Sequence, residues 1–191
     1  GCNAIYECGG LTDIVFAEGL EEIDSEAFFR CPQLQTLRLP ASVKSIGEGF
    51  VVNCKGIKNY QLAGANSYYK VVDGVLYNAD GTTLIAYPSA ASGESFTLPE
   101  SVTRIGDYAF AYSQHLKSIK FGKKVTEMGR KAFYESKALA GSISIPGTIR
   151  VVADSAFYLC NYLTEVTFEE GVQKIGKDAI GHCASIEKVS M

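Results

Sequence analysis

The sequence predicts an α/β solenoid, in which short repeated units stack into one right-handed array. One face would be a curved parallel sheet, the other face short helices, and one β-hairpin insertion would interrupt the array. Two observations predict the repeat. An apolar residue, here named the anchor, recurs every 23 or 24 residues with one longer gap, and similar apolar patterns follow each anchor. Such a period is typical of solenoids. The anchors are Ile23, Ile46, Ile105, Met128, Val152 and Ile175.

The first half of each unit is predicted to be a short helix. Apolar residues stand four, five, eight and eleven positions after the anchor, an arrangement that follows one face of a helix. The residue eight positions after the anchor is Cys or Ser, and the eleventh is Leu or Ile. The residues at the fourth and fifth positions are Ala27-Phe28, Phe50-Val51, Ala109-Phe110, Ala132-Phe133, Ala156-Phe157 and Ala179-Ile180.

The second half of each unit is predicted to be a short strand with one buried face. Apolar residues alternate there, as in Leu37 and Leu39 or Ile143 and Ile145. One helix and one strand cannot bury their apolar sides alone, so neighbouring units must stack. We therefore expect the strands to lie parallel, about 4.8 Å apart, in one curved sheet.

The chain is predicted to form a single domain, 1–191. Anchors Ile46 and Ile105 lie 59 residues apart, which is one period plus 36 residues. Apolar segments separated by Asp-Gly pairs fill the extra length and predict hairpins where a helix would be. The predicted parts are a partial repeat 1–19, repeats 20–62, a β insertion 63–95 and repeats 96–191.

The chain starts inside a unit and lacks an initiator Met, so we expect a fragment or a processed form. It contains no signal peptide and no apolar run long enough to span a membrane, which predicts no membrane insertion.

Two stretches, SVTRIGDYAF at 101–110 and CPQLQTLRLP at 31–40, make the chain similar to a known family. The chain resembles the BspA-like leucine-rich repeat family of bacterial surface and secreted proteins over nearly its whole length. The resemblance implies a leucine-rich repeat solenoid, an extracellular or cell-surface location, and a place within a longer protein. It also implies adhesion or host-protein binding, which is attributed to some members. Departures from the pattern are Phe50-Val51 in place of Ala-Phe and Ser113 and Ser136 in place of Cys.

Composition and charge exclude some partners. The chain is 47% apolar, with 18 basic and 21 acidic residues and a net charge of −3. These charges are scattered along the sequence, so neither nucleic acid nor an anionic membrane is an expected partner.

The cysteines and histidines do not predict a metal site or a disulfide framework. Five of six cysteines occupy the same position of the repeat, so their side chains should point the same way, which is poor disulfide geometry. We expect reduced, buried thiols. There is no Cys-x-x-Cys, and the two histidines, His115 and His182, stand at different positions of the repeat.

Motifs of enzymes and cofactor sites are also missing. Gly47-Glu48-Gly49 lacks the third glycine of a dinucleotide loop, and there is no phosphate loop and no serine nucleophile elbow. Asp73, Asn78 and Asp80 faintly resemble a calcium loop, but Asp-Gly pairs between apolar strands are typical hairpin turns. We therefore predict a protein without catalytic residues, cofactor or metal.

Two surfaces are candidates for binding. The first, the candidate concave face, consists of outward strand residues: Arg38, Asn59, Gln61, Lys120, Glu165, Thr167 and Lys188. Such a polar row suits a protein or a glycan, although an ordinary solvated sheet has the same composition. The second, the aromatic column, stands six residues after the anchor on the convex side: Tyr6, Phe29, Tyr134 and Tyr158. These rings either contact a protein or cover the ridge between neighbouring units.

Two functional hypotheses follow. The first is a non-enzymatic protein-binding or adhesion module whose partner is a host or matrix protein, or else a glycan. The alternative is a purely structural spacer or stalk of a larger surface protein. An enzyme would need a cleft with converging titratable groups, which the sequence does not indicate. Contiguous exposure of either candidate surface would favour the binding module.

Overall fold

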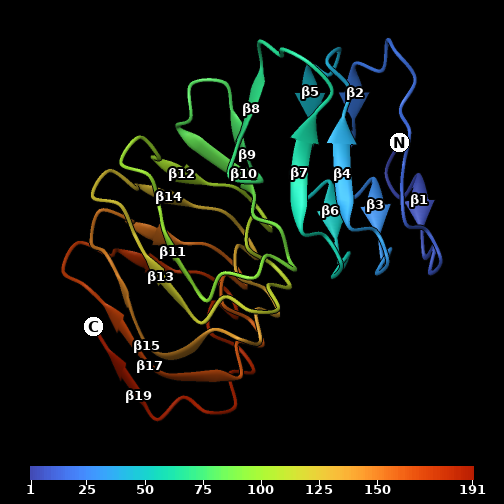
Figure 1. The fold of residues 1–191 in the computed structure, drawn as a ribbon. Coiled ribbons are helices and arrows are strands. Elements are labelled where there is room, and N and C mark those ends of the chain that lie inside the picture. Colours follow the sequence, from blue (N-terminus) through green and yellow to red (C-terminus); the bar gives the residue numbers. More distant parts are fainter.

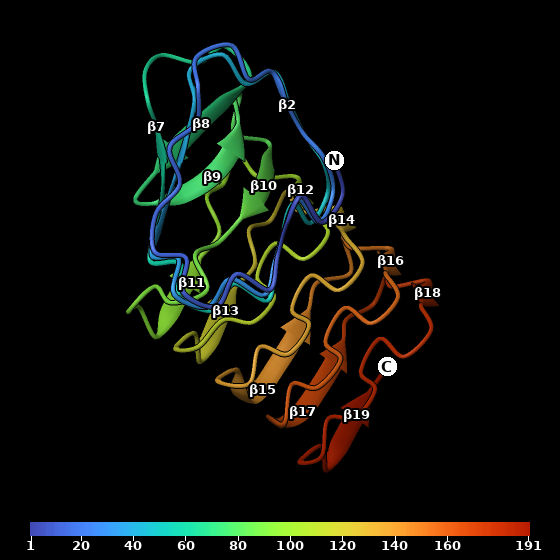
Figure 2. The ribbon, with the colours of Figure 1, turned by 90° about the vertical axis from the view of Figure 1, so that its right-hand side faces the viewer.

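The structure is a computed structural model that describes all 191 residues. The chain winds in successive coils built from nineteen short strands, and it contains no helix (Figure 1). Each regular coil has a two-residue anchor strand and, on the opposite edge, a longer outer strand; Figure 2 shows the two rows. The anchor strands are β2 (Glu22–Ile23), β5 (Ser45–Ile46), β10 (Thr83–Ala86), β12 (Arg104–Ile105), β14 (Glu127–Met128), β16 (Val151–Val152) and β18 (Lys174–Ile175). The outer strands are β4 (Thr36–Leu39), β7 (Asn59–Leu62), β11 (Ser95–Thr97), β13 (Ser118–Lys120), β15 (Ala140–Ile145), β17 (Tyr162–Phe168) and β19 (Lys188–Ser190).

The predicted register of the anchors is confirmed. Ile23 lies opposite Ile46, and Ile105, Met128, Val152 and Ile175 follow one another across parallel pairs. The outer strands also pair in parallel, with Arg38 opposite Gln61 and Glu165 opposite Lys188. The chain is therefore a solenoid of stacked parallel coils, as the period predicts.

The prediction of short helices is wrong, and backbone conformation is the reason. Residues three and seven positions after each anchor have φ between 51° and 61°, as Lys131 and Glu135 do. Two left-handed residues four positions apart interrupt a right-handed helix. The backbone instead hydrogen-bonds to the next coil. Phe110 N donates to Ala132 O, and Phe133 N to Ala156 O, both at 2.7 Å. In the first coils this row even forms the strands β1 (Ile5–Tyr6), β3 (Phe28–Phe29) and β6 (Val51–Val52).

The prediction of one curved sheet is also wrong. The outer strands form three separate sheets: β4-β7, β11-β13 and β15-β17-β19. The interruption between β7 and β11 coincides with the insertion, where the coils change direction (Figure 1). The core divides at the same place, into a cluster of 14 residues between Ile23 and Ala86 and one of 26 residues between Val75 and Ala179. We name residues 1–62 the N-terminal body and residues 83–191 the C-terminal body.

The predicted hairpins are present in the insertion, but one strand also belongs to the solenoid. Strands β8 (Tyr69–Val72) and β9 (Val75–Asn78) pair antiparallel around a turn at Asp73 and Gly74, which both have positive φ. Strand β9 then pairs antiparallel with β10. Strand β10 pairs in parallel with β12, and Leu84 lies opposite Ile105 in the place of an anchor. The segment thus adds a shortened coil of 21 residues beside the hairpin, while the boundaries at 63 and 95 stay a prediction.

All six cysteines are free thiols. Cys31, Cys54 and Cys160 are buried, Cys183 is half-buried, and Cys2 and Cys8 are exposed. The expected column is therefore buried only in the coils that have neighbours on both sides, because each neighbour covers the thiol beside it.

Candidate functional site

The candidate concave face lies on the outer strands in three groups. Arg38 and Gln61 are adjacent on β4 and β7, Lys120 stands on β13, and Glu165, Thr167 and Lys188 lie together on β17 and β19. Arg38, Gln61, Lys120 and Lys188 are exposed, whereas Asn59, Glu165 and Thr167 are half-buried. The break between β7 and β11 separates the first group from the others. The face is therefore discontinuous, because the insertion changes the direction of the coils.

Arg38 and Lys120 are the free cations of this face. Neither makes an ion pair, and Arg38 borders a hollow of about 350 Å³ together with Phe16 and Pro40. Lys188, by contrast, donates to Glu165 Oε1 at 2.6 Å. An exposed pair of this kind contributes at most about 1 kcal/mol, but it leaves neither charge free for a partner.

Asn59 is partly covered by the hairpin turn. Its backbone neighbour Tyr60 donates to Gly74 O at 2.9 Å, and a Cβ at Gly74 would lie 3.1 Å from Asn59 Cβ. The amide oxygen Oδ1 of Asn59 is buried without a hydrogen-bond partner. The hairpin therefore withdraws Asn59 from the surface that the sequence predicts for it.

The aromatic column consists of two stacked pairs. Tyr6 and Phe29 lie with ring centroids 5.2 Å apart at 9°, and Tyr134 and Tyr158 lie 5.3 Å apart at 5°. Rings stacked in this way present their edges to solvent and their faces to each other. This geometry favours the alternative in which the column covers the ridge between coils. Burial also raises the pKa of Tyr134, with a smaller contribution from Glu135.

A second aromatic group, which was not predicted from the sequence, lies at the junction of the two bodies. Lys131 Nζ donates to the hydroxyl of Tyr108 at 2.8 Å and lies 5.1 and 5.5 Å from the rings of Tyr108 and Tyr134. The hydrogen bond to Tyr108 raises the pKa of Lys131. Tyr112 is buried beside this group, and burial raises its pKa. Tyr108 and Lys131 both stand three residues after their anchors, so the spacing places them on adjacent coils, but it does not indicate that the two side chains meet.

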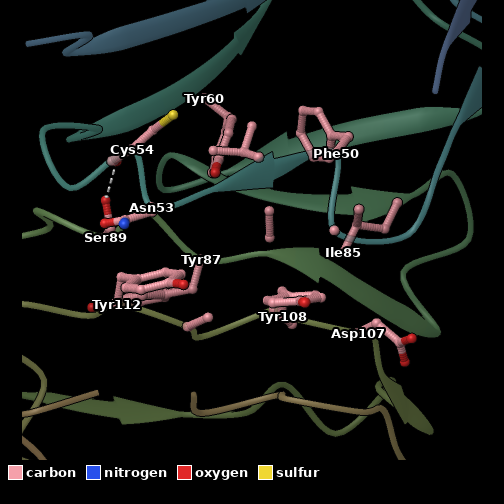
Figure 3. Close-up of a pocket in the computed structure, with 15 residues that line it drawn as sticks. Phe50, Asn53, Cys54, Tyr60, Ile85, Tyr87, Ser89, Asp107, Tyr108 and Tyr112 are labelled. Atoms are coloured by element: carbon pink, nitrogen blue, oxygen red, sulfur yellow. Dashed lines mark hydrogen bonds between the residues drawn. The ribbon is translucent and has the colours of Figure 1, made fainter. Parts of the chain in front are cut away.

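A small hollow lies between the two bodies (Figure 3). Its volume of about 20 Å³ holds roughly one water molecule and is too small for a substrate. Ser89 Oγ donates to the carbonyl of Cys54 at 2.8 Å across it. Burial raises the pKa of Cys54 to about 12, so its thiol stays protonated and unreactive.

A column of carboxylates crosses the coils two residues after the anchors. Asp107 Oδ1 accepts from Arg130 N, and Asp154 Oδ1 accepts from Lys177 N, both at 2.8 Å. A glycine follows the anchor in each coil whose backbone N–H donates to these carboxylates. A Cβ at Gly129 would lie 2.5 Å from Asp107 Oδ1, and one at Gly176 would lie 2.5 Å from Asp154 Oδ1.

One pair of coils lacks this pairing of a glycine with a carboxylate. The coil of Val152 carries Ala153 instead of glycine, and the preceding coil carries Arg130 instead of a carboxylate. The methyl group of Ala153 occupies the space that a carboxylate would need. Arg130 therefore turns toward the previous coil, where its Nε donates to Asp107 Oδ2 at 3.0 Å.

Two open polar hollows flank this column, with volumes of about 420 and 330 Å³. Three arginines line the smaller one: Arg104, Arg130 and Arg150. No group of three or more His, Cys, Asp or Glu residues is arranged to hold a metal ion. The structure contains no helix of the length and hydropathy that a membrane span requires.

Comparison with protein families identifies the repeat. The family model described as the BspA type leucine rich repeat region matches six copies, over residues 1–91 and 84–191. The two ranges together cover the whole chain and confirm the resemblance found in the sequence. A search of curated proteins finds no match.

Solved structures give a similar result. The pneumococcal vaccine antigen PcpA superposes with a TM-score of 0.93 at 28% identity, over 99% of this chain and 47% of that chain. A leucine-rich repeat protein from Eubacterium ventriosum gives a TM-score of 0.78 at 26% identity, over 94% and 54%. A leucine rich cell surface protein from Faecalibacterium prausnitzii gives 0.74 at 24% identity, over 96% and 60%, which shows the fold alone. The chain thus spans between about half and three fifths of the length of these proteins.

Proposed function

Because the chain belongs to the BspA-type leucine-rich repeat family, we propose that it is a non-enzymatic protein-binding module of a bacterial cell-surface or secreted protein. Leucine-rich repeat solenoids are typically scaffolds for protein interaction rather than enzymes. A structural neighbour at 28% identity is described as a pneumococcal vaccine antigen, which supports a location at the surface. The partner is a host or matrix protein, with a glycan as the second candidate.

One observation carries this proposal. Arg38, Gln61 and Lys120 are exposed on outer strands, and the two cations have no ion-pair partner in the chain. Short parallel strands in hydrogen-bonded rows hold their positions firmly, so a partner meets polar groups at fixed spacing. Exposed unpaired cations favour association and orientation of a partner more than they favour folding.

A different observation favours the alternative of a structural spacer. Several candidate residues are already satisfied within the chain, since Lys188 pairs with Glu165, the hairpin covers Asn59 and the aromatic column stacks on itself. A spacer needs no free binding group. The remaining free cations, Arg38 and Lys120, therefore decide between the two functions.

Capture from a panel of extracellular matrix and serum proteins and glycans tests this choice. The wild-type chain is compared with the double variant Arg38→Glu/Lys120→Glu. A matched control, Lys123→Glu/Lys124→Glu, makes the same change in net charge at exposed lysines in the turn after β13. We expect at least one protein to bind the wild type and the control and to bind the double variant about tenfold more weakly. Absence of binding by the wild type and by both variants would support the spacer. Equal binding by all three would show that Arg38 and Lys120 are not the binding residues.

A further inference from the structure

An arginine-lined groove runs along the outside of the anchor strands in the C-terminal body. It has a volume of about 330 Å³ and is bordered by β12, β14 and β16. Arg104, Arg130 and Arg150 come from three successive coils and line it, above a floor that includes Met128 and Val151. Parallel strands of successive coils lie about 4.8 Å apart, which brings the three side chains to one surface although they stand at different positions of the repeat.

The three arginines differ in how much of their charge is used within the chain. Arg104 donates to Glu48 Oε1 at 2.8 Å. Arg130 uses Nε for Asp107, and its side chain remains 71% exposed, so its terminal amino groups are free. Arg150 is exposed and makes no ion pair or side-chain hydrogen bond. The groove therefore offers the planar guanidinium groups of Arg130 and Arg150, a geometry suited to carboxylate oxygens.

The charge of the surrounding body acts in the same direction. The C-terminal body, residues 83–191, carries twelve basic and eleven acidic residues, a net charge of +1. The N-terminal body, residues 1–62, carries five basic and eight acidic residues, a net charge of −3. The neighbouring hollow of about 420 Å³ shares Arg130 and Asp107 with the groove, but five acidic residues line it against three basic ones. An anionic segment is therefore attracted more to the C-terminal body than to the N-terminal body, and there to Arg130 and Arg150 rather than to the neighbouring hollow.

The acidic residues in the groove narrow the choice of ligand. Asp107 and Glu127 line it beside the arginines, and Val151 is 46% exposed within it. A phosphate polymer, with a charge about every 3.4 Å along each strand, would bring some of its charges against these carboxylates. An extended peptide carries side chains on one face only about every 6.6 Å, and it offers apolar groups to Val151 as well.

We propose that this groove binds a carboxylate-bearing segment of a protein partner, whose Asp or Glu side chains contact Arg150 and Arg130. The proposal rests on the proposed function and deepens it, because it names the chemistry of the partner and a surface other than the candidate concave face.

Fluorescence anisotropy with a labelled peptide of five Glu-Ser repeats tests the proposal in about 50 mM salt. The Arg150→Glu variant is compared with Lys123→Glu, which changes the charge of the same body equally but outside the groove. We expect the wild type and Lys123→Glu to bind within twofold of each other and Arg150→Glu to bind about tenfold more weakly. A Lys-Ser peptide should not bind. Thermal unfolding confirms that both variants are folded.

Two outcomes would overturn the proposal. In the first, the wild type does not bind the Glu-Ser peptide at millimolar concentration. In the second, both variants lose the same affinity. Binding of a heparin oligosaccharide without binding of the peptide would assign the groove to a sulfated glycan instead. If the capture experiment depends on Arg38 and Lys120 while the peptide does not bind, the proposed function stands and the groove proposal fails. If the peptide binds as expected while the capture finds no partner, the groove proposal stands and the strand-face function fails.

Discussion

The two bodies of this solenoid use the same repeat but pack their aromatic residues differently. In the C-terminal body, Phe110, Phe133 and Phe157 stack face to face at 4.9 and 4.8 Å, with interplanar angles of 5°. In the N-terminal body, Phe28 and Phe50 meet edge to face at 6.4 Å. Phe50 occupies the position where other coils carry Ala, one residue before the usual Phe. The comparison indicates that face-to-face stacking requires a Phe at the same position of consecutive coils.

At the junction between the two bodies one coil is shortened, and side chains make contacts where the backbone of a full-length coil would lie. The shortened coil after Leu84 lacks two residues of the normal period, so its part of the carboxylate column is absent. Glu48 reaches across this place, where its Oε2 accepts from Asp107 N at 2.9 Å. Tyr108 packs against Gly49, where a Cβ would lie 2.6 Å from the ring.

The largest expected effect concerns the stacked phenylalanines. Phe133→Ala should lower the free energy of unfolding by about 4 to 5 kcal/mol, because the ring is fully buried and stacked on both sides. Phe28→Ala should cost about 3 kcal/mol, because its ring makes only edge contacts. Urea denaturation measures both. An equal loss in the two variants would show that the difference in stacking has no energetic consequence.

The next effect concerns the pairing of glycine with carboxylate. Gly129→Ala should cost about 2 to 3 kcal/mol, because the added Cβ would lie 2.5 Å from both the backbone N and the Oδ1 of Asp107. The matched control is Ala153→Gly, at the same position of the next repeat, where no carboxylate approaches. It should cost about 1 kcal/mol or less through chain entropy. Thermal unfolding compares them, and a larger loss in the control would contradict the steric explanation.

A third effect is a loss of stability in alkali. Burial raises the pKa of Cys54 from 9.0 to about 12, so above pH 9 the unfolded thiol ionises while the folded one keeps its proton. The unfolded state then binds fewer protons, and stability falls as pH rises from 9 to about 12. At pH 10 the loss should be about 1 kcal/mol, and Cys54→Ser should reduce it. An unchanged pH profile in that variant would exclude Cys54 as the cause.

The smallest effect concerns the junction. Glu48→Ala should cost about 0.5 to 1 kcal/mol, because the side chain is half-exposed but bridges the two bodies through Arg104 and Asp107. Glu127→Ala is the control, since its contact with Arg104 is 3.8 Å long and it lies on the same surface. Amide hydrogen exchange should show faster exchange near Asp107 in the first variant only. Equal exchange rates in the two variants would show that Glu48 does not stabilise the junction.

Much of the architecture could be predicted because it depends on periodic burial. The anchors from Ile23 to Ile175 fall in register, since an anchor is buried only where the same position of a neighbouring coil covers it, and Ile175 in the last coil is 39% exposed. The offsets of Ala132, Phe133 and Ser136 indicated correctly that these residues are buried, but not how the backbone turns between them. Inward-facing residues four, five and eight positions after an anchor suit a helix and also suit two left-handed turns stacked on other coils.

The candidate sites were less predictable. The outward position of Arg38 and Lys120 follows from strand alternation, whereas the covering of Asn59 depends on where the hairpin folds. The charges are less evenly scattered than expected, because the N-terminal body carries a net charge of −3 and the C-terminal body one of +1, a difference that a count along the sequence would have found. The arginine groove combines residues at different positions of three repeats, so spacing alone could not identify it.

The sequence by itself determined the repeat, its register and which side chains are buried, because these follow from the need of each unit to cover its neighbour's apolar surface. Only the tertiary structure decided that the coils lack helices, that the array changes direction at the insertion and that Arg150 is left unpaired. These features depend on hydrogen bonds between the backbones of different coils and on contacts across the junction, which no single repeat contains.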